Sequence, residues 1–301
     1  MPRLSVIMPV LDGERYLPQT LASLEASLPR DAELRVMDDG STDSTPRLLA
    51  EVAERDRRFI VHRHEKPAGV AASLNELAEA GDSEHIARMD GDDIVMRHRF
   101  SIADFALRKA DFAFTSVVFI DADGKIRGAD QPGRFSPAAV PYHLTFGCML
   151  VHPTVTMRRS VFDALGGYAD TRAEDYELWM RAAASGARLV RTALPGLRYR
   201  RHSGQVTARS PWLAEDEDSP LYPAFGALLD HVLGHRPDGW KAVFASALGA
   251  SELSPDTAAH TTALHREVVE AARSVLTPAD LALLKWRASR EARRIRARTR
   301  A

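Results

Sequence analysis

Short apolar runs alternate with amphipathic stretches through the first third of the chain. Four of the runs are continuous enough to predict strands that lie buried in a sheet. They are LSVIMPV, AELRVMD, RFIVHRH and HIARMD. Between them, residues 13–27, 41–56 and 69–81 carry apolar side chains three and four positions apart, which predicts helices. Strands separated by single helices predict right-handed crossovers and a mainly parallel sheet.

The pattern changes after Arg97. Residues 97–110 predict a helix, and residues 111–128 predict a strand, a turn at DADG and a hairpin. Later segments are a strand and helix in HPTVTMRRSVFDALGGY, a helix in AEDYELWMRAAASG and strands in ARLVRTALPGLRYRRH. The polar stretch 203–220 predicts a loop, and the rest predicts helices. We expect one domain over 1–210, then a mobile loop and helical C-terminal extension over 211–301.

Composition narrows the class of protein. The chain has 301 residues, 45% of them hydrophobic, and a formal net charge of −1, which favours no nucleic-acid partner. A single cysteine, Cys148, excludes an internal disulfide and a cysteine-built metal site. The N-terminal apolar run is broken by Pro9 and Asp12, and no stretch approaches the roughly 18 apolar residues of a membrane span. We therefore expect a cytoplasmic protein.

Carboxylates follow two of the predicted parallel strands. Asp38 and Asp39 end one strand, and Asp90, Asp92 and Asp93 follow another. Ligands of open α/β sheets bind beyond the carboxyl ends of the strands. So much negative charge needs a cation, and Mg²⁺ or Mn²⁺ prefers oxygen ligands together with substrate phosphates. Either cluster alone also fits a turn, since Asp-Gly and Asp-Asp pairs are common turn formers.

Two other acidic patterns are less informative. DGDDIVMRHR lacks the central Gly and closing Glu of a calcium-binding EF-hand loop. DADGKI, residues 121–126, lies between β-rich segments, and a hairpin turn is the favoured interpretation over a ligand site.

Six motifs together resemble one large family. They are SVIMPVLDGERYLPQTLASL, VMDDGSTDST, HIARMDGDDI, HPTVTMRRSVFDALGGY, EDYELWMR and YRRHSGQVT. Their order and spacing over residues 3–210 resemble the inverting nucleotide-sugar glycosyltransferases of family 2. The resemblance implies an α/β protein with the GT-A fold, in which helices flank a Rossmann-like, mainly parallel central sheet.

The resemblance also implies a donor-nucleotide site. Its residues would be Pro9, Val10, Asp12, Glu14, Asp39, Gly69, Asn75, Asp90 and Gly91. Asp39 would bind the base, and Asp90 the ribose or a metal-bound water. SLN stands where many members have Ala-Arg-Asn, so the arginine contact with the diphosphate is absent from this helix. Asp93 would stabilise the loop or touch the donor sugar.

The metal and catalytic residues follow from the same resemblance. Asp92 would bind Mn²⁺ or Mg²⁺, and His202 would complete the metal site, contact the diphosphate or lie on the surface. Asp175 would be the general base, with Glu174 assisting it or binding the acceptor; the alternative is that both acids only cap a helix. Arg198, Arg200 and Arg201 would offset diphosphate charge or face solvent.

The implied activity is metal-dependent, inverting transfer of a sugar from a nucleotide-diphosphate donor, expected to be a UDP-sugar, to a hydroxyl of a glycan or lipid-linked acceptor. Residues 285–301 contain eight Lys or Arg and one Glu. They are interpreted either as a solvated helix end or as peripheral contact with the inner face of a membrane.

Two rival functions stay open at this point. A nucleotidyltransferase has a similar sheet and also uses acids and a metal, but it usually carries a Gly-rich, basic N-terminal loop that VIMPVLDGERY lacks. A non-catalytic nucleotide-sugar-binding protein is excluded only by turnover.

Overall fold

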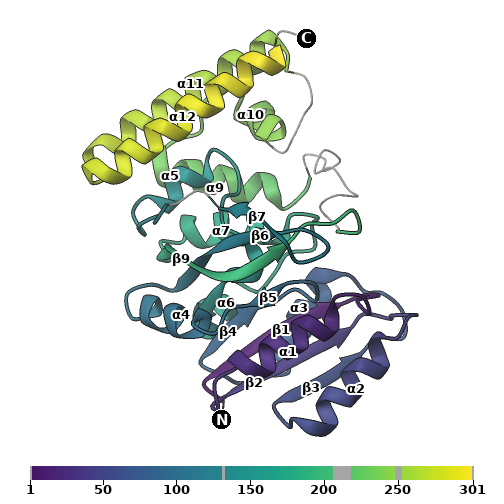
Figure 1. The fold of residues 1–301 in the computed structure, drawn as a ribbon. Helices are drawn as coiled ribbons and strands as arrows, with labels where there is room; N and C mark the ends of the chain where they lie inside the picture. The colour runs from purple at the N-terminus through teal and green to yellow at the C-terminus, as the bar shows by residue number, and fades with distance from the viewer. Residues whose placement is uncertain (1, 131–132, 206–217, 248–252, 300–301) are drawn as a thin grey trace. The chain divides into compact units, whose positions relative to one another are not determined.

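The computed structural model describes residues 2–130, 133–205, 218–247 and 253–299 (Figure 1). The chain divides into two compact units, each assembled from three separate stretches. Unit 1 comprises Met1–Arg134, Leu150–Tyr168 and Val190–Gln205, and unit 2 comprises Phe135–Met149, Ala169–Leu189 and Val206–Ala301. The boundary expected at residue 210 stays a prediction. Most of the expected mobile loop, residues 206–217, lies outside the described residues.

Unit 1 holds one sheet, which has nine strands within the described residues. Their order is β3-β2-β1-β4-β8-β6-β9-β5, with β7 paired to β6. The strands are β1 (Leu4–Val10), β2 (Ala32–Asp38), β3 (Phe59–Arg63), β4 (His85–Arg88), β5 (Ile94–Val95), β6 (Phe112–Ile120), β7 (Ile126–Ala129), β8 (Thr156–Arg158) and β9 (Leu189–Arg200).

The strands expected from the first third of the chain form the parallel half of this sheet. β1 pairs in parallel with both β2 and β4, and β2 pairs in parallel with β3. β8 runs antiparallel to both β4 and β6, and β5 runs antiparallel to β9. Since β2 and β4 flank β1 in the same direction, their carboxyl ends meet at one edge. The two acidic clusters therefore follow strands that share this edge.

Helices cover both faces of the parallel half. The helices of unit 1 are α1 (Leu17–Ser27), α2 (Thr45–Arg55), α3 (Val70–Glu79), α4 (Arg99–Leu107), α6 (Arg159–Ala164) and the short η1 (His152–Thr154). Val6 and Met8 of β1 share a buried cluster with Leu21 of α1 and Leu49 of α2. Each such side chain contributes about 1.5–3 kcal/mol through burial. The alternate residues of β1 face the other side, where α3 packs against β1 and β2.

Two segments beside the sheet are fixed by aspartate side chains. DADG is a hairpin turn between β6 and β7, as predicted, and the Asp121 carboxylate accepts from the backbone N–H groups of Asp123 and Lys125. Thr45 is the first residue of α2 and not its N-cap. The Asp43 carboxylate accepts from Thr45 N at 2.8 Å, and Thr45 Oγ1 instead accepts from Gly13 N at 2.8 Å.

Unit 2 is helical within its described residues. Its helices are α5 (Val140–Leu144), α7 (Glu174–Ala184), α9 (Leu221–Leu233), α10 (Trp240–Ala247), α11 (Pro255–Ala271), η3 (Ala272–Ser274) and α12 (Pro278–Thr299). α7 packs against α9, and α11 and α12 lie side by side (Figure 1). The helical pattern predicted after Leu221 is confirmed. Among the described residues, no helix combines the length and apolar character needed to cross a bilayer.

The basic C-terminal segment is a helix joined to the rest of unit 2. Arg287 of α12 is half-buried and donates to the backbone oxygens of Phe146, at 3.2 Å, and Gly147, at 2.9 Å. Phe146 in turn stacks on His265 of α11, with ring centroids 4.1 Å apart. Arg287 is therefore a structural residue, although it belongs to the basic run.

Candidate active site

Three aspartates gather just after β4. Asp90, Asp92 and Asp93 each offer a carboxylate oxygen, and these oxygens lie within 4.8 Å of one another. Asp90 and Asp92 are half-buried, whereas Asp93 is buried completely. The predicted carboxylate cluster therefore exists as a compact group, and its oxygens are the ligand type that hard divalent cations prefer.

Asp93 is the innermost of the three acids. Burial first, and then the charges of Asp90 and Asp92, raise the pKa of its carboxyl well above the usual range. Its Oδ1 accepts from Arg200 N at 2.8 Å, while its Oδ2 is buried without a hydrogen-bond partner. A buried carboxylate oxygen without a donor is costly unless a cation completes it.

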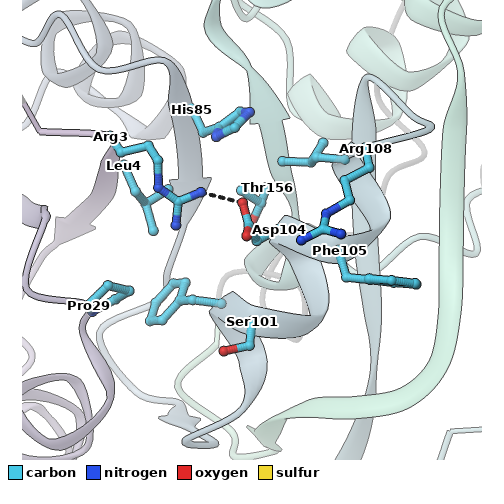
Figure 2. A pocket seen from close by; sticks show the side chains of 11 residues that line it. Arg3, Leu4, Pro29, His85, Ser101, Asp104, Phe105, Arg108 and Thr156 are labelled. Atoms are coloured by element: carbon cyan, nitrogen blue, oxygen red, sulfur yellow. Dashed lines mark hydrogen bonds and ion pairs between the residues drawn. The ribbon is translucent and has the colours of Figure 1, made fainter.

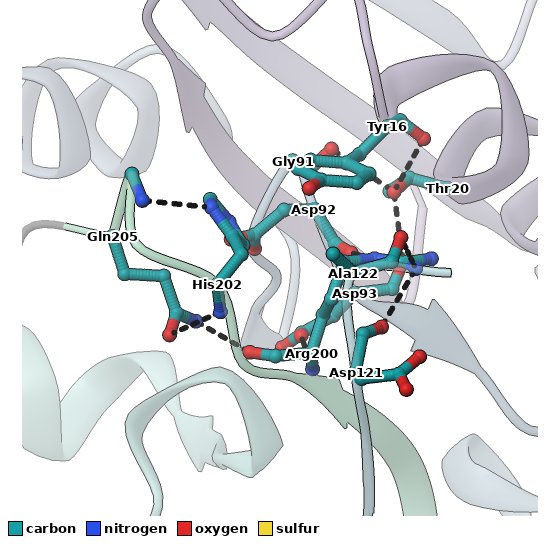
Figure 3. A network of polar contacts seen from close by, with 11 residues as sticks. Tyr16, Thr20, Gly91, Asp92, Asp93, Asp121, Ala122, Arg200, His202 and Gln205 are labelled. Carbon is teal, nitrogen blue, oxygen red and sulfur yellow. Dashed lines mark hydrogen bonds and ion pairs between the residues drawn. The ribbon is translucent and has the colours of Figure 1, made fainter. Parts of the chain in front are cut away.

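Hydrogen bonds from Arg200 hold the acidic loop in place (Figure 3). Its guanidinium donates to the backbone oxygen of Asp92 at 2.7 Å, to that of Ala122 at 3.1 Å and to Gln19 Oε1 at 2.8 Å. The side chain is 1% exposed. The interpretation that Arg200 faces solvent is therefore wrong, whereas a role in offsetting diphosphate charge stays a prediction. Arg200 ties α1, the acidic loop and the β6–β7 turn together.

Two more arginines lie behind the loop. Arg88, the last residue of β4, forms an ion pair with Asp90. Arg99, the first residue of α4, is fully buried and donates to the backbone oxygens of Arg88 and Val155. Burial lowers the pKa of Arg99 to about 10, which still leaves it charged at neutral pH. Fixed positive charge thus offsets the repulsion among the aspartates.

His202 lies at the cluster, as the resemblance implied. Its Nε2 is 2.9 Å from Asp92 Oδ2, and its Nδ1 accepts from Gly204 N at 3.1 Å (Figure 3). Its ring lies against Tyr16, with centroids 4.7 Å apart. Since Nδ1 accepts a proton donor in this arrangement, Nε2 carries the hydrogen in the neutral ring, and it donates to Asp92.

Val10 and two glycines set the shape of the adjoining loops. A Cβ at Gly91 would lie 2.9 Å from a methyl of Val10, and one at Gly13 would lie 2.7 Å from its other methyl. Pro9 lies beyond the last β1–β4 pair, Ile7 with Arg88, so its missing N–H removes no bond from that ladder. Gly91 and Val10 therefore meet in direct contact where the donor was expected to bind.

Asp12 and Glu14 fasten the β1–α1 loop to the β2–α2 loop. Asp12 Oδ1 accepts from Thr42 N at 2.9 Å, and Glu14 Oε2 accepts from Ser44 N at 3.0 Å. In the reverse direction, Asp12 N donates to Ser41 Oγ at 2.9 Å and Glu14 N to an Asp43 oxygen at 3.0 Å. These reciprocal bonds make the two loops at the sheet edge one rigid unit.

Asp39 binds the backbone of the β3–α3 loop. Its carboxylate accepts from Ala68 N at 2.8 Å and Gly69 N at 3.0 Å, and lies 2.7 Å from His64 Nδ1. Burial opposes ionisation of Asp39, but the hydrogen bonds from Ala68 and His64 outweigh it and lower the pKa of the carboxyl. Gly69 begins α3 with a φ of +97°, a backbone conformation that favours glycine. One lone pair of Asp39 Oδ2 stays available in this arrangement.

Asn75 has both ends of its amide occupied. Nδ2 donates to the backbone oxygen of Tyr168 at 2.9 Å, and Oδ1 accepts from Tyr168 N at 2.9 Å. A Cβ at Gly167 would lie 2.6 Å from Asn75 Oδ1, so the glycine allows this contact. Asn75 therefore joins α3 to the segment that follows α6, and its role toward a nucleotide stays a prediction.

The two proposed catalytic acids lie in unit 2, whereas all the other expected site residues lie in unit 1. Glu174 and Asp175 are half-buried in the first turn of α7. Asp175 Oδ1 accepts from Tyr176 N at 2.7 Å. The N-terminal end of a helix stabilises a carboxylate and so favours its ionised form.

Sequence reasoning missed several residues around the site. His64 and Tyr16 contact partners that are distant along the chain, so no local motif marks those contacts, whereas Arg88 lies only two residues before its partner Asp90. His64 also carried a signal, because it is the last residue of the predicted strand RFIVHRH.

Comparison with known structures identifies the fold. Staphylococcus aureus TarS, residues 1–349, solved in complex with UDP-GlcNAc, matches with a TM-score of 0.63 and 16% identity, over 98% of this chain and 90% of that one. The mannosyltransferase PcManGT of Pyrobaculum calidifontis, in complex with GDP-Man and Mn²⁺, matches with a TM-score of 0.54 and 18% identity, over 96% and 80%. The fold is the GT-A glycosyltransferase fold.

Sequence comparison supplies the family. Residues 5–166 match the family model described as Glycosyl transferase family 2, and the chain belongs to this family of glycosyltransferases. EpsE of Bacillus subtilis (strain 168), provisionally named a glycosyltransferase, is 31% identical over 196 residues, 62% of this chain and 69% of EpsE. The Escherichia coli protein WfaP, named UDP-Glc:alpha-D-GlcNAc-diphosphoundecaprenol beta-1,3-glucosyltransferase, is 26% identical over 216 residues, 69% of this chain and 81% of WfaP.

The contacts of His64 predict its titration. Hydrogen bonds to Asp39 and then to Glu76, at 2.8 Å from Nε2, raise the pKa of the imidazole. Protonated His64 therefore stabilises the fold fully below about pH 6.5, its usual unfolded value, and this contribution disappears as pH rises through the folded pKa. NMR titration of the His64 ring should give a midpoint above 6.5.

A matched pair of variants checks the cause. Glu76→Gln should lower that midpoint, whereas Glu79→Gln, an exposed acid on the same helix, should leave it unchanged. A His64 midpoint that is the same in Glu76→Gln and in the parent protein would contradict the contribution of Glu76.

Proposed function

We propose that this glycosyltransferase transfers a sugar from a UDP-sugar to a hydroxyl of a glycan or lipid-linked acceptor, with inversion at the anomeric carbon and dependence on a divalent metal. The observation that carries the proposal is the group of Asp90, Asp92 and Asp93 with His202 at the carboxyl end of β4. TarS was solved with UDP and with UDP-GlcNAc, and WfaP is named for a UDP-Glc donor, which supports the choice of nucleotide.

The acidic cluster fits a divalent cation. Asp92 would be the principal ligand, with His202 beside it, and Asp90 would contact the ribose or a metal-bound water. No described residue donates a hydrogen bond to the buried Oδ2 of Asp93, which supports a role for a cation nearby. Mn²⁺ or Mg²⁺ supplies Lewis acidity that neutralises the charge of the leaving diphosphate. The Mn²⁺ complex of PcManGT supports Mn²⁺ as the ion.

Asp175 would be the general base. Its carboxylate lies in the first turn of α7, where a helix end favours negative charge, and would take the proton of the acceptor hydroxyl as that oxygen attacks the anomeric carbon. Attack from the face opposite the nucleotide inverts the configuration. A positioned base contributes about 10²–10⁴-fold to the rate. Glu174 would assist Asp175 or bind the acceptor.

The unit 1 loops would bind the nucleotide. Pro9 and Val10, with Gly91 in close contact with Val10, would border the nucleotide base, and Asp39 keeps one lone pair for a base N–H. Asp12, Glu14, Gly69 and Asn75 would act mainly by fixing the loops. Preorganised contacts of this kind lower the entropy cost of binding.

The acceptor proposal extends to a membrane surface. The name of WfaP includes a diphosphoundecaprenol, a lipid-linked sugar, and α12 of this chain exposes Lys285, Trp286, Arg293 and Arg296. A basic helix attracts anionic lipid by about 1 kcal/mol per residue near the surface. We propose that α12 brings the enzyme to the inner face of a membrane.

Metal dependence can be measured by calorimetry of UDP binding. UDP should bind at least about tenfold more tightly with Mn²⁺ than with EDTA, because a divalent cation attracts a diphosphate by several kcal/mol near a protein surface. Asp92→Ala should remove this enhancement. Asp123→Ala, at an exposed aspartate of the β6–β7 turn, is the matched control and should retain it. Equal affinity of the parent protein in EDTA and Mn²⁺ would sink the metal role.

The role of Asp175 can be separated from binding. Asp175→Asn keeps the shape and capping ability of the side chain but cannot accept the proton. It should bind UDP and Mn²⁺ with near-parent affinity and lose at least about 10²-fold in transfer rate. Asp256→Asn, in the first turn of α11, is the matched control. Full turnover of Asp175→Asn would exclude it as the base, and loss of UDP affinity would make it a donor-site or structural residue.

Membrane contact can be tested without cutting α12, whose Arg287 is structural. The parent protein should co-sediment with phosphatidylserine vesicles at low salt and be released at high salt. Changing Lys285, Arg293 and Arg296 together to Gln should abolish co-sedimentation. The same change at Arg30, Arg57 and Arg198, which are also exposed, removes equal charge and should not. Equal loss in both triple variants would refute a surface specific to α12.

A further inference from the structure

A cavity lies at the amino-terminal ends of β1 and β4, whereas the acidic loop follows the carboxyl end of β4. Its volume is about 390 Å³, and it lies wholly within unit 1 (Figure 2). Leu4 and His85, the first residues of β1 and β4, line it, and Asp90 follows the other end of β4. Helix α4 supplies Phe100 and Phe105. A ligand in this cavity would therefore be separated from the donor site by the length of the strands.

Two buried polar atoms of the lining have no hydrogen-bond partner. They are His85 Nε2 and Thr156 Oγ1, on side chains that are 7% and 3% exposed. The nearest carboxylate oxygen to His85 Nε2, on Glu84, is 3.7 Å away, beyond hydrogen-bond distance. Burial lowers the pKa of His85, so its ring is neutral at pH 7 and one nitrogen can accept. Buried polar atoms are rarely left without partners, so each of these suits a ligand or water.

The rim offers the guanidinium of Arg108. Arg3 and Asp104 also line the cavity, and Asp104 is the one carboxylate among the eleven lining residues. Arg3 is paired with both Asp104 and Asp31. The Arg108 guanidinium lies 5.5 Å from the centre of the Phe105 ring, and among the described residues no carboxylate pairs with it. Phe105 is itself 72% exposed, an unusual state for a large aromatic side chain.

We propose that this cavity binds a small amphipathic anion, a compact apolar or aromatic body that carries one carboxylate or phosphate. Arg108 pairs with the anionic group, and Phe100 and Phe105 contact the apolar body. His85 and Thr156 bind a polar atom at the inner end. Five of the eleven lining residues are apolar and six are polar or charged, a mixture that suits a ligand with both an apolar body and an anionic group. The site is additional to the proposed donor and acceptor sites.

Phenyl phosphate and benzoate are suitable probes, used with the full chain in EDTA so that metal-dependent binding at the acidic loop does not contribute. Amide NMR shifts of Thr156 and Phe105 should report saturable binding of at least one probe, and the tighter probe identifies the preferred anion. Arg108→Gln and Thr156→Val should each weaken it about fivefold or more. Arg57→Gln, at an exposed arginine that does not line the cavity, should have no effect.

Three results would overturn the proposal. The first is failure of both aromatic anions to bind, or shifts confined to the acidic loop. The second is equal affinity in all three variants and the parent protein. The third is equally tight binding of inorganic phosphate or of benzyl alcohol, since the first lacks the apolar body and the second lacks the charge. Arg108 is exposed and Thr156→Val keeps the side-chain shape, so both variants should fold.

Discussion

Mutual repulsion among Asp90, Asp92 and Asp93 is the constraint on which the rest of unit 1 depends. Three carboxylates within 4.8 Å need compensation that water cannot supply at the buried Asp93. The compensation comes from Arg88 and Arg99, which lie behind the loop, and from the backbone N–H of Arg200. These groups belong to a strand, a helix and a late strand of the same sheet. The acidic loop therefore requires the sheet to be complete, and its geometry is a property of the whole unit.

Much of the parallel half could be predicted from sequence. Apolar runs such as LSVIMPV have a local cause, burial on both faces, and carboxylates placed directly after such runs must reach the sheet edge. The antiparallel half was visible only as separate strands. Its order depends on pairing between segments far apart in the chain, as where β8 inserts between β4 and β6. Hydrophobic periodicity carries no information about such partners.

Because the sequence pattern does not identify tertiary partners, it also could not show what each site residue contacts. Among several arginines late in the chain, nothing in RYRRH distinguishes Arg200, and it is the one buried because β9 aims it at the acidic loop. Asn75 occupies a position implied by the family motif, and its amide both donates to and accepts from the backbone of Tyr168. Asp39 likewise holds the β3–α3 loop through Ala68 and Gly69. A motif thus identifies a residue that lies near the ligand. Whether that residue contacts the ligand or holds a neighbouring loop in place depends on its partners in the folded chain.

The packing of α7 against α9 has a consequence for synthesis in the cell. α7 is made before α9, so the part of its surface that α9 covers stays open until then, although α5, which also packs against α7, is already present. At about 5–20 residues per second this exposure lasts seconds, long enough for chaperones to bind. Unit 1, whose last stretch is Val190–Gln205, can close earlier. A nascent chain would thus acquire its acidic loop before the helix that carries Asp175 is anchored, and translation itself would delay enzymatic competence.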